Sequence, residues 1–256
     1  MQLLVSVRNA DEARDALDGG ADVIDAKDPS RGALGAVDGV TLARVVSVTG
    51  RERPVSAALG DVCSERETEL LAHQAAAHGV SFIKMGFAGV SDADRAGTLL
   101  AAAVRGASGA SGASGSCGVI AVAYADADRA NAISPTAVIR IAHDTGARGV
   151  LLDTAFKEGR TVFAIMGELH LGQWVAEAHR HHLMVALAGQ LSASDFSRAR
   201  SLGAGMVGVR GAACVGGRTG VVSRNRVAAL AAVVNERQIF ASAAGRACGS
   251  TIETRN

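Results

Sequence analysis

Short apolar segments alternate with longer amphipathic segments along almost the whole chain. The amphipathic segments, such as "TLARVVSVTG" and "TAVIRIAHDTG", carry apolar residues at i, i+3, i+4 and i+7, which is the spacing of one helical face. Several end at a glycine, a residue suited to the end of a helix. The apolar segments have the length of strands, and there are eight of them: 3–7, 23–27, 54–59, 82–87, 118–125, 149–155, 184–189 and 206–211.

This alternation predicts an α/β fold, a single-domain (β/α)8 TIM barrel over residues 1–240. Eight strand–helix units of about 30 residues each have the number and spacing of that barrel. A doubly wound open sheet would alternate in the same way, but no glycine-rich nucleotide fingerprint follows the first strand. Only 3% of the residues are aromatic and 48% are hydrophobic, which agrees with aliphatic strands buried on both faces of a parallel sheet.

Two stretches interrupt the pattern. The Gly/Ser-rich stretch at about 106–117 predicts a flexible loop between the fourth helix and the fifth strand, on the barrel face away from the chemistry. The tail at 241–256 has no clear periodicity, and two interpretations stay open: a disordered tail, or a segment that packs on another subunit of a homo-oligomer. The sequence does not fix the oligomeric state.

Charge and composition argue against several classes of function. Acidic and basic residues are interspersed, with a net charge of +1, so we expect neither nucleic acid nor a membrane surface as a partner. No apolar stretch approaches the roughly 20 residues of a membrane span, and Met1 leads directly into a strand pattern without a signal peptide. The four cysteines are far apart in the sequence, which favours free thiols over a zinc site or disulfides: Cys63, Cys117, Cys214 and Cys248. We therefore expect a cytoplasmic protein.

Lysine is rare in this chain. Of 26 basic residues only three are lysines, namely Lys27, Lys84 and Lys157, and the others are arginines. A guanidinium stays protonated, whereas a desolvated amine can lose its proton and attack a carbonyl carbon. All three lysines lie at or near the ends of predicted strands, where TIM barrels place their reacting groups. The lysines are therefore the first candidates for chemistry.

Carboxylates accompany these lysines at the strand ends. Asp25 precedes Lys27 by two residues, on the same side of its strand, and Asp153 lies four residues before Lys157. Asp61 and Asp126 also follow predicted strands. Amines and carboxylates that converge can form an imine with a carbonyl substrate and move protons, or they can hold an anion such as phosphate. A simple structural ion pair between Asp25 and Lys27 is the competing interpretation.

The last two predicted strands end in small residues typical of a phosphate site. Gly189, Gly211 and Ala212 could offer backbone N–H groups, and Arg210 could add a bidentate contact. The histidine-rich stretch "EAHRHH" at 177–182 resembles a metal-binding tract, but it ends a helix on the opposite face of the barrel. The sequence therefore predicts a phosphate-binding cradle, and neither a metal site nor a cofactor.

The motifs at the strand ends also point to a family. "DAKDPSRGALGA", "SAALGD", "FIKMG", "AYADADR", "LLDTAFKEG", "VALAG" and "VGVRGAAC" occur in order between about residues 2 and 238. Together they resemble the (5-formylfuran-3-yl)methyl phosphate synthases, also called 4-(hydroxymethyl)-2-furancarboxaldehyde-phosphate synthases. The Gly/Ser stretch and the tail depart from the family pattern, and both lie outside the motifs.

The resemblance implies a TIM-barrel enzyme that condenses two molecules of glyceraldehyde 3-phosphate, a step toward methanofuran-type one-carbon carriers. It implies that Lys27 forms the Schiff base and that Lys84, Lys157, Asp25 and Asp153 support it. Two alternatives stay open. A Schiff-base (class I) aldolase would use the same lysine and phosphate site, and a non-catalytic barrel could use the lysines to bind a phosphorylated metabolite.

Overall fold

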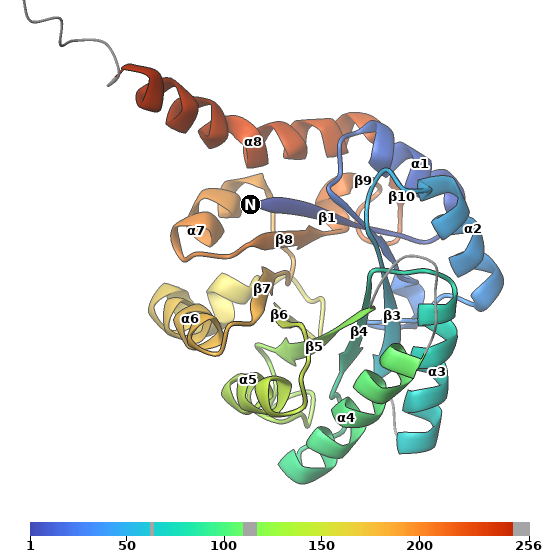
Figure 1. Cartoon of the computed structure of the whole chain (residues 1–256). Coiled ribbons are helices and arrows are strands. Elements are labelled where there is room, and N and C mark those ends of the chain that lie inside the picture. The colour runs from blue at the N-terminus through green and yellow to red at the C-terminus, as the bar shows by residue number, and fades with distance from the viewer. Residues whose placement is uncertain (62–63, 110–116, 248–256) are drawn as a thin grey trace, which may run out of the picture.

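A computed structural model describes residues 1–61, 64–109 and 117–247, and for 236–247 it describes the backbone alone. Eight parallel strands close into a barrel (Figure 1), with each strand hydrogen-bonded to the next and the last to the first. The strands are β1 (Gln2–Val7), β2 (Val23–Ala26), β3 (Val55–Asp61), β4 (Phe82–Gly86), β5 (Gly118–Tyr124), β6 (Gly149–Asp153), β7 (Met184–Leu187) and β8 (Met206–Val209).

Helices follow the strands and surround the barrel, as Figure 1 shows. They are α1 (Ala10–Asp18), α2 (Gly39–Thr49), α3 (Glu65–Ala77), α4 (Ala93–Gly109), α5 (Pro135–Asp144), α6 (Val162–Arg180), α7 (Phe196–Ser201) and α8 (Arg224–Ala247). Several begin where a side chain caps the first turn: Asp38, Ser64, Ser134 and Thr161 each accept a hydrogen bond from a backbone N–H of their helix. The predicted single-domain (β/α)8 barrel is therefore confirmed.

The period-two pattern of the strands separates two apolar cores. Residues such as Leu3, Ile24 and Leu152 face outward and pack under the helices. Their neighbours, such as Leu4 and Leu151, face inward and fill the barrel. Parallel register places the last inward-facing residue of every strand at the same end of the barrel, so the strand-end polar residues meet there.

Two predicted boundaries differ in the structure. The fourth helix extends to Gly109, so residues 106–109 of the Gly/Ser stretch are helical rather than part of a loop. A Cβ on Gly106 would lie 2.2 Å from the backbone oxygen of Glu69 in α3, and this close approach explains the glycine. The remaining residues of that stretch, 110–116, lie outside the described part of the chain.

The C-terminal helix also exceeds its predicted end. Helix α8 continues through residues 241–247, which the sequence assigned to an irregular tail, and it extends past the barrel in Figure 1. Residues 248–256 lie outside the described part of the chain, so the two interpretations of the tail stay untested.

Further small elements follow β2, β7 and β8: the 3-10 turns η1 (Pro29–Arg31), η2 (Ala193–Asp195) and η3 (Gly211–Ala213), and an antiparallel hairpin of β9 (Cys214–Val215) and β10 (Val221–Val222). The pattern of hydrophobic positions did not predict this hairpin, because two-residue strands are too short to show a period.

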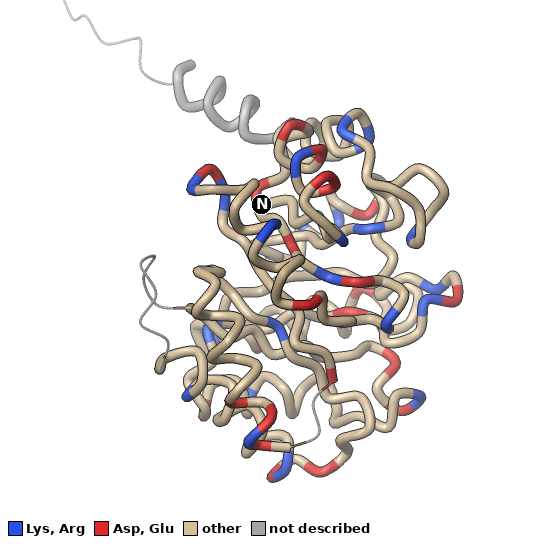
Figure 2. Tube along the Cα trace, turned by 90° about the vertical axis from the view of Figure 1, so that its right-hand side faces the viewer, with Lys and Arg blue, Asp and Glu red and all other residues tan. Residues whose placement is uncertain are grey.

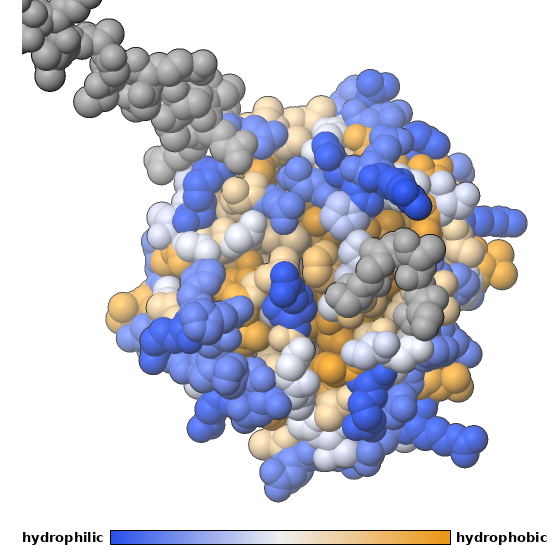
Figure 3. Space-filling view, in the orientation of Figure 1, coloured by the Kyte–Doolittle hydropathy of each residue, from blue (hydrophilic) through white to orange (hydrophobic). Residues whose placement is uncertain are grey.

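Acidic and basic residues are interspersed along the trace in Figure 2. Figure 3 shows hydrophilic residues over much of the face in view, with apolar residues nearer its centre. No helix within the described ranges is both long and apolar enough to cross a membrane. Cys117 and Cys214 are free thiols, whereas Cys63 and Cys248 lie outside the described residues.

Candidate active site

The three lysines and two of the predicted aspartates line one cavity of about 360 Å³ at the C-terminal ends of the strands. Asp25 lies in β2, and Lys27 is the first residue after that strand. Lys84 lies in β4, and Asp153 is the last residue of β6. All four are buried. Lys157 reaches the same cavity from the loop after β6. The structure therefore brings together the five residues that the sequence proposed for chemistry.

Asp25 is held by partners on three strands. Lys84 Nζ lies 2.6 Å from Asp25 Oδ1, and the hydroxyls of Ser6 and Ser56 donate to the carboxylate at 2.8 and 2.7 Å. Burial alone would raise the pKa of Asp25, but the charges of Lys84 and Lys27 and the hydrogen bonds outweigh it and lower that pKa. The ion-pair partner is thus Lys84 from another strand, and the competing interpretation of a local Asp25–Lys27 pair is wrong.

Asp153 and Lys157 form a second ion pair in the cavity. Lys157 Nζ lies 2.5 Å from Asp153 Oδ1 and also donates to Thr154 Oγ1 at 3.2 Å. The backbone N–H of Thr154 donates to Asp153 Oδ1 at 2.7 Å. Burial would raise the pKa of Asp153, yet the charges of Lys157 and Lys27 and these hydrogen bonds lower it. Both carboxylates of the cavity are therefore ionised at neutral pH.

Lys27 differs from the other two lysines. Within the described residues no carboxylate lies within 4.0 Å of its amine, although Asp25 and Asp153 are close enough to raise its pKa. Burial and the charge of Lys84 lower that pKa from its usual 10.5 to about 8. Near pH 8 a large fraction of this amine is therefore neutral, the form that attacks a carbonyl carbon.

The predicted cradle residues line the same cavity. Gly189, Gly211 and Ala212 contribute to its wall, beside the lysines. Gly189 has a φ of +89°, and a Cβ there would lie 3.1 Å from both Thr154 and Val162, so glycine is needed for conformation and for space. Small residues at these positions leave the backbone open to a ligand.

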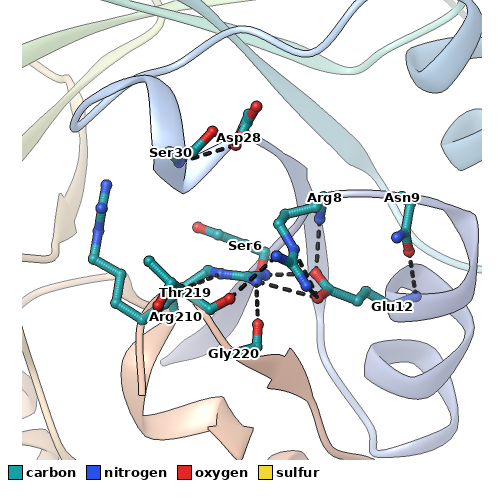
Figure 4. Close-up of polar contacts among 10 residues, drawn as sticks. Ser6, Arg8, Asn9, Glu12, Asp28, Ser30, Arg210, Thr219 and Gly220 are labelled. Atoms are coloured by element: carbon teal, nitrogen blue, oxygen red, sulfur yellow. Dashed lines mark hydrogen bonds and ion pairs between the residues drawn. The ribbon is translucent and has the colours of Figure 1, made fainter. Parts of the chain in front are cut away.

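The Arg210 side chain does not provide the phosphate contact that the sequence predicted. Figure 4 shows its guanidinium directed at Glu12, whose carboxylate oxygens lie 2.6 and 3.1 Å from it. The remaining bonds go to the backbone oxygens of Ser6, Arg218 and Gly220 at 2.8, 3.0 and 2.9 Å. All five N–H donors of Arg210 are therefore occupied within the protein.

Glu12 is the buried centre of an arginine clamp, which we define as Arg210, Glu12 and Arg8. Arg8 contributes a backbone N–H and its guanidinium to the Glu12 carboxylate, and it also donates to Thr219 O at 3.1 Å. Burial would raise the pKa of Glu12, but Arg210 and the Arg8 backbone N–H outweigh it and lower that pKa. Glu12 carried no sequence signal beyond its place in the first turn of a predicted helix.

Arg218, which the sequence analysis did not single out, also lines the cavity. Arg218 lies between the two strands of the hairpin β9–β10. Its guanidinium crosses to the loop after Lys27 and donates to the backbone oxygens of Pro29 and Gly32, both at 2.6 Å. The signal was its position in the glycine-rich segment "GVRGAACVGGRTG", which contains Arg210 as well.

Asp61 and Asp126 have structural partners instead of places in the cavity wall. Asp61 accepts hydrogen bonds from Tyr124 Oη at 2.7 Å and from the Ala88 N–H at 3.1 Å. Asp126 accepts from the N–H groups of Ala155 and Phe156 at 2.7 and 3.0 Å. The second pair of bonds ties Asp126 to the loop that carries Lys157.

The opposite end of the barrel contains a different kind of cavity. It has a volume of about 180 Å³ and a largely apolar lining that includes Phe82, Ile120 and Met184. His179 from the histidine-rich stretch lies here, as predicted, and away from Lys27. Within the described ranges, no cluster of three or more His, Cys, Asp or Glu residues is arranged to hold a metal ion.

Comparisons with known proteins identify the family to which the sequence is similar. A family model described as 4-HFC-P synthase matches residues 3–231. The chain is 39% identical over 230 residues to a protein of Methanothermobacter thermautotrophicus named (5-formylfuran-3-yl)methyl phosphate synthase, covering 89% of this chain and 96% of that protein. A protein of the same name from Methanocaldococcus jannaschii is 39% identical over 218 residues, covering 85% and 92%.

A solved structure supports the fold alone. Phosphoribosyl anthranilate isomerase from Thermus thermophilus superposes with a TM-score of 0.60 at 13% sequence identity, over 93% of this chain and all of that chain. At this identity the likeness extends to the barrel and not to the chemistry.

Proposed function

The chain belongs to the 4-HFC-P synthase family of enzymes, and from that premise we propose that it condenses two molecules of glyceraldehyde 3-phosphate into (5-formylfuran-3-yl)methyl phosphate through a Schiff base on Lys27. The product is a precursor of the furan of methanofuran-type carriers. One observation carries the proposal: Lys27 is a buried amine whose pKa is lowered to about 8, between two lysine–carboxylate pairs.

The chemistry begins with the neutral amine of Lys27. It attacks the aldehyde carbon of one triose phosphate, and loss of one water gives an iminium ion. The iminium acidifies the adjacent C–H bond, so removal of that proton gives an enamine whose carbon attacks the aldehyde of the second triose. The distance of 2.5 Å between Lys157 Nζ and Asp153 Oδ1 supports a role for this pair in moving protons in these steps.

The mass balance closes without a redox partner. Two triose phosphates give the six-carbon furan aldehyde phosphate, one inorganic phosphate and two molecules of water. Electrons are neither gained nor lost overall, so the reaction requires no nicotinamide or flavin. The amine of Lys27 is released when the imine is hydrolysed or displaced, which completes the cycle. We propose that backbone N–H groups of Gly189, Gly211 and Ala212 hold a substrate phosphate in the cavity.

A direct assay separates this function from its two alternatives. Incubation with glyceraldehyde 3-phosphate should produce the ultraviolet absorbance of a conjugated furan aldehyde, and borohydride should add mass to Lys27. A class I aldolase would give the trapped lysine without the absorbance. A non-catalytic binding barrel would give neither result, and labelling at Lys84 or Lys157 would overturn the assignment of the nucleophile.

A further inference from the structure

The cavity has to accommodate two phosphate groups if the proposed function holds, because each triose brings one. Five cationic side chains line it: Lys27, Lys84, Lys157, Arg210 and Arg218. A phosphate dianion in a partly buried site needs donors that are not already occupied. The ion pairs and hydrogen bonds of the five cations show which of them combines such donors with a positive charge that no nearby carboxylate balances.

Four of the five cations have other tasks. Lys84 is paired with Asp25, and Lys157 is paired with Asp153, so a carboxylate already balances the positive charge of each. The guanidinium of Arg210 directs all five of its donors at protein oxygens. Lys27 must lose its proton to act as the nucleophile, so it cannot also serve as a fixed positive charge.

Arg218 has both charge and free donors. Among the residues that the structure describes, its guanidinium makes two hydrogen bonds, to Pro29 O and Gly32 O, which leaves three of its five N–H groups for a ligand. Its backbone lies beside Gly211, where an added Cβ would be 3.7 Å from the Arg218 nitrogen. The side chain therefore extends from the predicted glycine cradle toward the loop that follows Lys27.

We propose that Arg218 is a substrate-binding residue that holds the phosphate of one of the two triose substrates, in a subsite distinct from the glycine cradle. This inference rests on the proposed function for the identity of the ligand. A planar guanidinium can present two parallel N–H groups to phosphate oxygens, a geometry that an ammonium cannot reproduce.

The arginine clamp fixes the backbone from which the Arg218 side chain extends. Arg210 binds the backbone oxygens of Arg218 and Gly220, and Arg8 binds that of Thr219 between them. These bonds hold three consecutive carbonyl groups of the hairpin against the end of the barrel, as Figure 4 shows for Thr219 and Gly220. Arg210 is thus a positioning residue for Arg218, which accounts for two arginines in one glycine-rich segment.

The test compares Arg218→Gln and Arg218→Lys with a matched control, Thr219→Ala. Thr219 is the exposed neighbour of Arg218, and its backbone oxygen, which accepts a hydrogen bond from Arg8, is kept by the substitution. Three quantities are measured: KM and kcat for furan formation, the Kd of inorganic phosphate by calorimetry, and borohydride trapping of Lys27 with glyceraldehyde, which has no phosphate.

We expect Arg218→Gln to raise KM and the phosphate Kd by about tenfold or more, with a smaller change in kcat and unchanged trapping by glyceraldehyde. Arg218→Lys should give an intermediate increase, because it keeps the charge and loses the bidentate geometry. Thr219→Ala should match the wild type. If Arg218→Gln does not fold, the Lys variant alone decides: phosphate binding equal to that of the wild type overturns the proposal.

Two further results would overturn it. An unchanged KM and phosphate Kd in Arg218→Gln would show that the guanidinium does not bind phosphate. Equal losses with glyceraldehyde and glyceraldehyde 3-phosphate would show that Arg218 only ties the hairpin to the loop after Lys27. If the wild type forms no furan, the proposed function fails, but the phosphate titration still tests Arg218 on its own.

Discussion

Two charged clusters built on buried carboxylates lie at the same end of the barrel, and they use different cations. The lysine cluster, which comprises Lys27, Lys84, Lys157, Asp25 and Asp153, surrounds an open cavity and includes an amine with no carboxylate of its own. The arginine clamp packs around Glu12 with every donor of Arg210 occupied. The carboxylates of both clusters are buried, yet the proposed reaction uses only the first cluster, where an amine can become neutral.

The difference follows from the chemistry of the two side chains. A guanidinium keeps its charge and its fixed fork of donors, so it suits a permanent clamp on a carboxylate and on backbone oxygens. An amine is more easily deprotonated, and burial with a second cation lowers the pKa of Lys27 to about 8. The three lysines among 26 basic residues thus line the cavity in which the proposed reaction requires an amine.

We expect the largest effect when an arginine replaces the central lysine of the lysine cluster. Lys27→Arg should abolish furan formation and borohydride trapping, because a guanidinium keeps a positive charge but cannot form the imine. A thermal melt should show a folded protein. Lys157→Arg is the matched control: it should remain trappable at Lys27. Residual turnover in Lys27→Arg would show that another group is the nucleophile.

The second test removes the centre of the arginine clamp. Glu12→Ala leaves the buried guanidinium of Arg210 without its carboxylate, so we expect a loss of about 3 to 5 kcal/mol in the free energy of unfolding. Urea denaturation measures the change. A loss below about 1 kcal/mol would contradict a clamp that stabilises the barrel, because exposed ion pairs contribute no more than that.

The third test concerns the electrostatic coupling inside the lysine cluster. Imine formation needs the neutral amine, so the trapping rate should rise with pH through about 8, the pKa of Lys27. Lys84 lowers this pKa more than Lys157 does. Lys84→Met should therefore move the rise to higher pH, and Lys157→Met should move it less. Trapping by an unphosphorylated aldehyde, followed by mass spectrometry across pH, measures both shifts; a shift to lower pH would contradict the coupling.

The smallest expected effect gives a baseline for both clusters. Arg105 and Glu69 form an exposed ion pair between α4 and α3, with Nη2 and Oε2 3.0 Å apart. Since solvent screens such pairs, Arg105→Gln should change the free energy of unfolding by about 1 kcal/mol or less and leave the pH profile unchanged. The measurement is the same urea denaturation. If Arg105→Gln lowered the free energy of unfolding as much as Glu12→Ala, burial would not explain the stability that the clamp contributes.

The order of elements could be predicted from the sequence because hydrophobic periodicity is local. Eight apolar segments with helical patterns between them predicted the barrel. Side chains alternate between the two sides of a strand, so the spacing of two residues put Asp25 and Lys27 on the same side. Parallel strands bring their ends to one edge, so the convergence of Lys27, Lys84 and Asp153 followed from the fold. The extent of α4 and α8 did not follow, since glycine, serine and alanine carry weak periodicity.

The tertiary structure alone decided which charged groups are partners. Asp25 pairs with Lys84 from β4 and not with Lys27 two residues away, because closing the barrel brings nonadjacent strands within reach across its interior. Arg210 and Arg218 lie eight residues apart in one glycine-rich segment and both line the cavity. Glu12 and three backbone oxygens occupy every donor of Arg210, whereas Arg218 makes two hydrogen bonds among the described residues and keeps three donors. Sequence spacing sets the side of a strand, whereas partners depend on distances that only the closed barrel fixes.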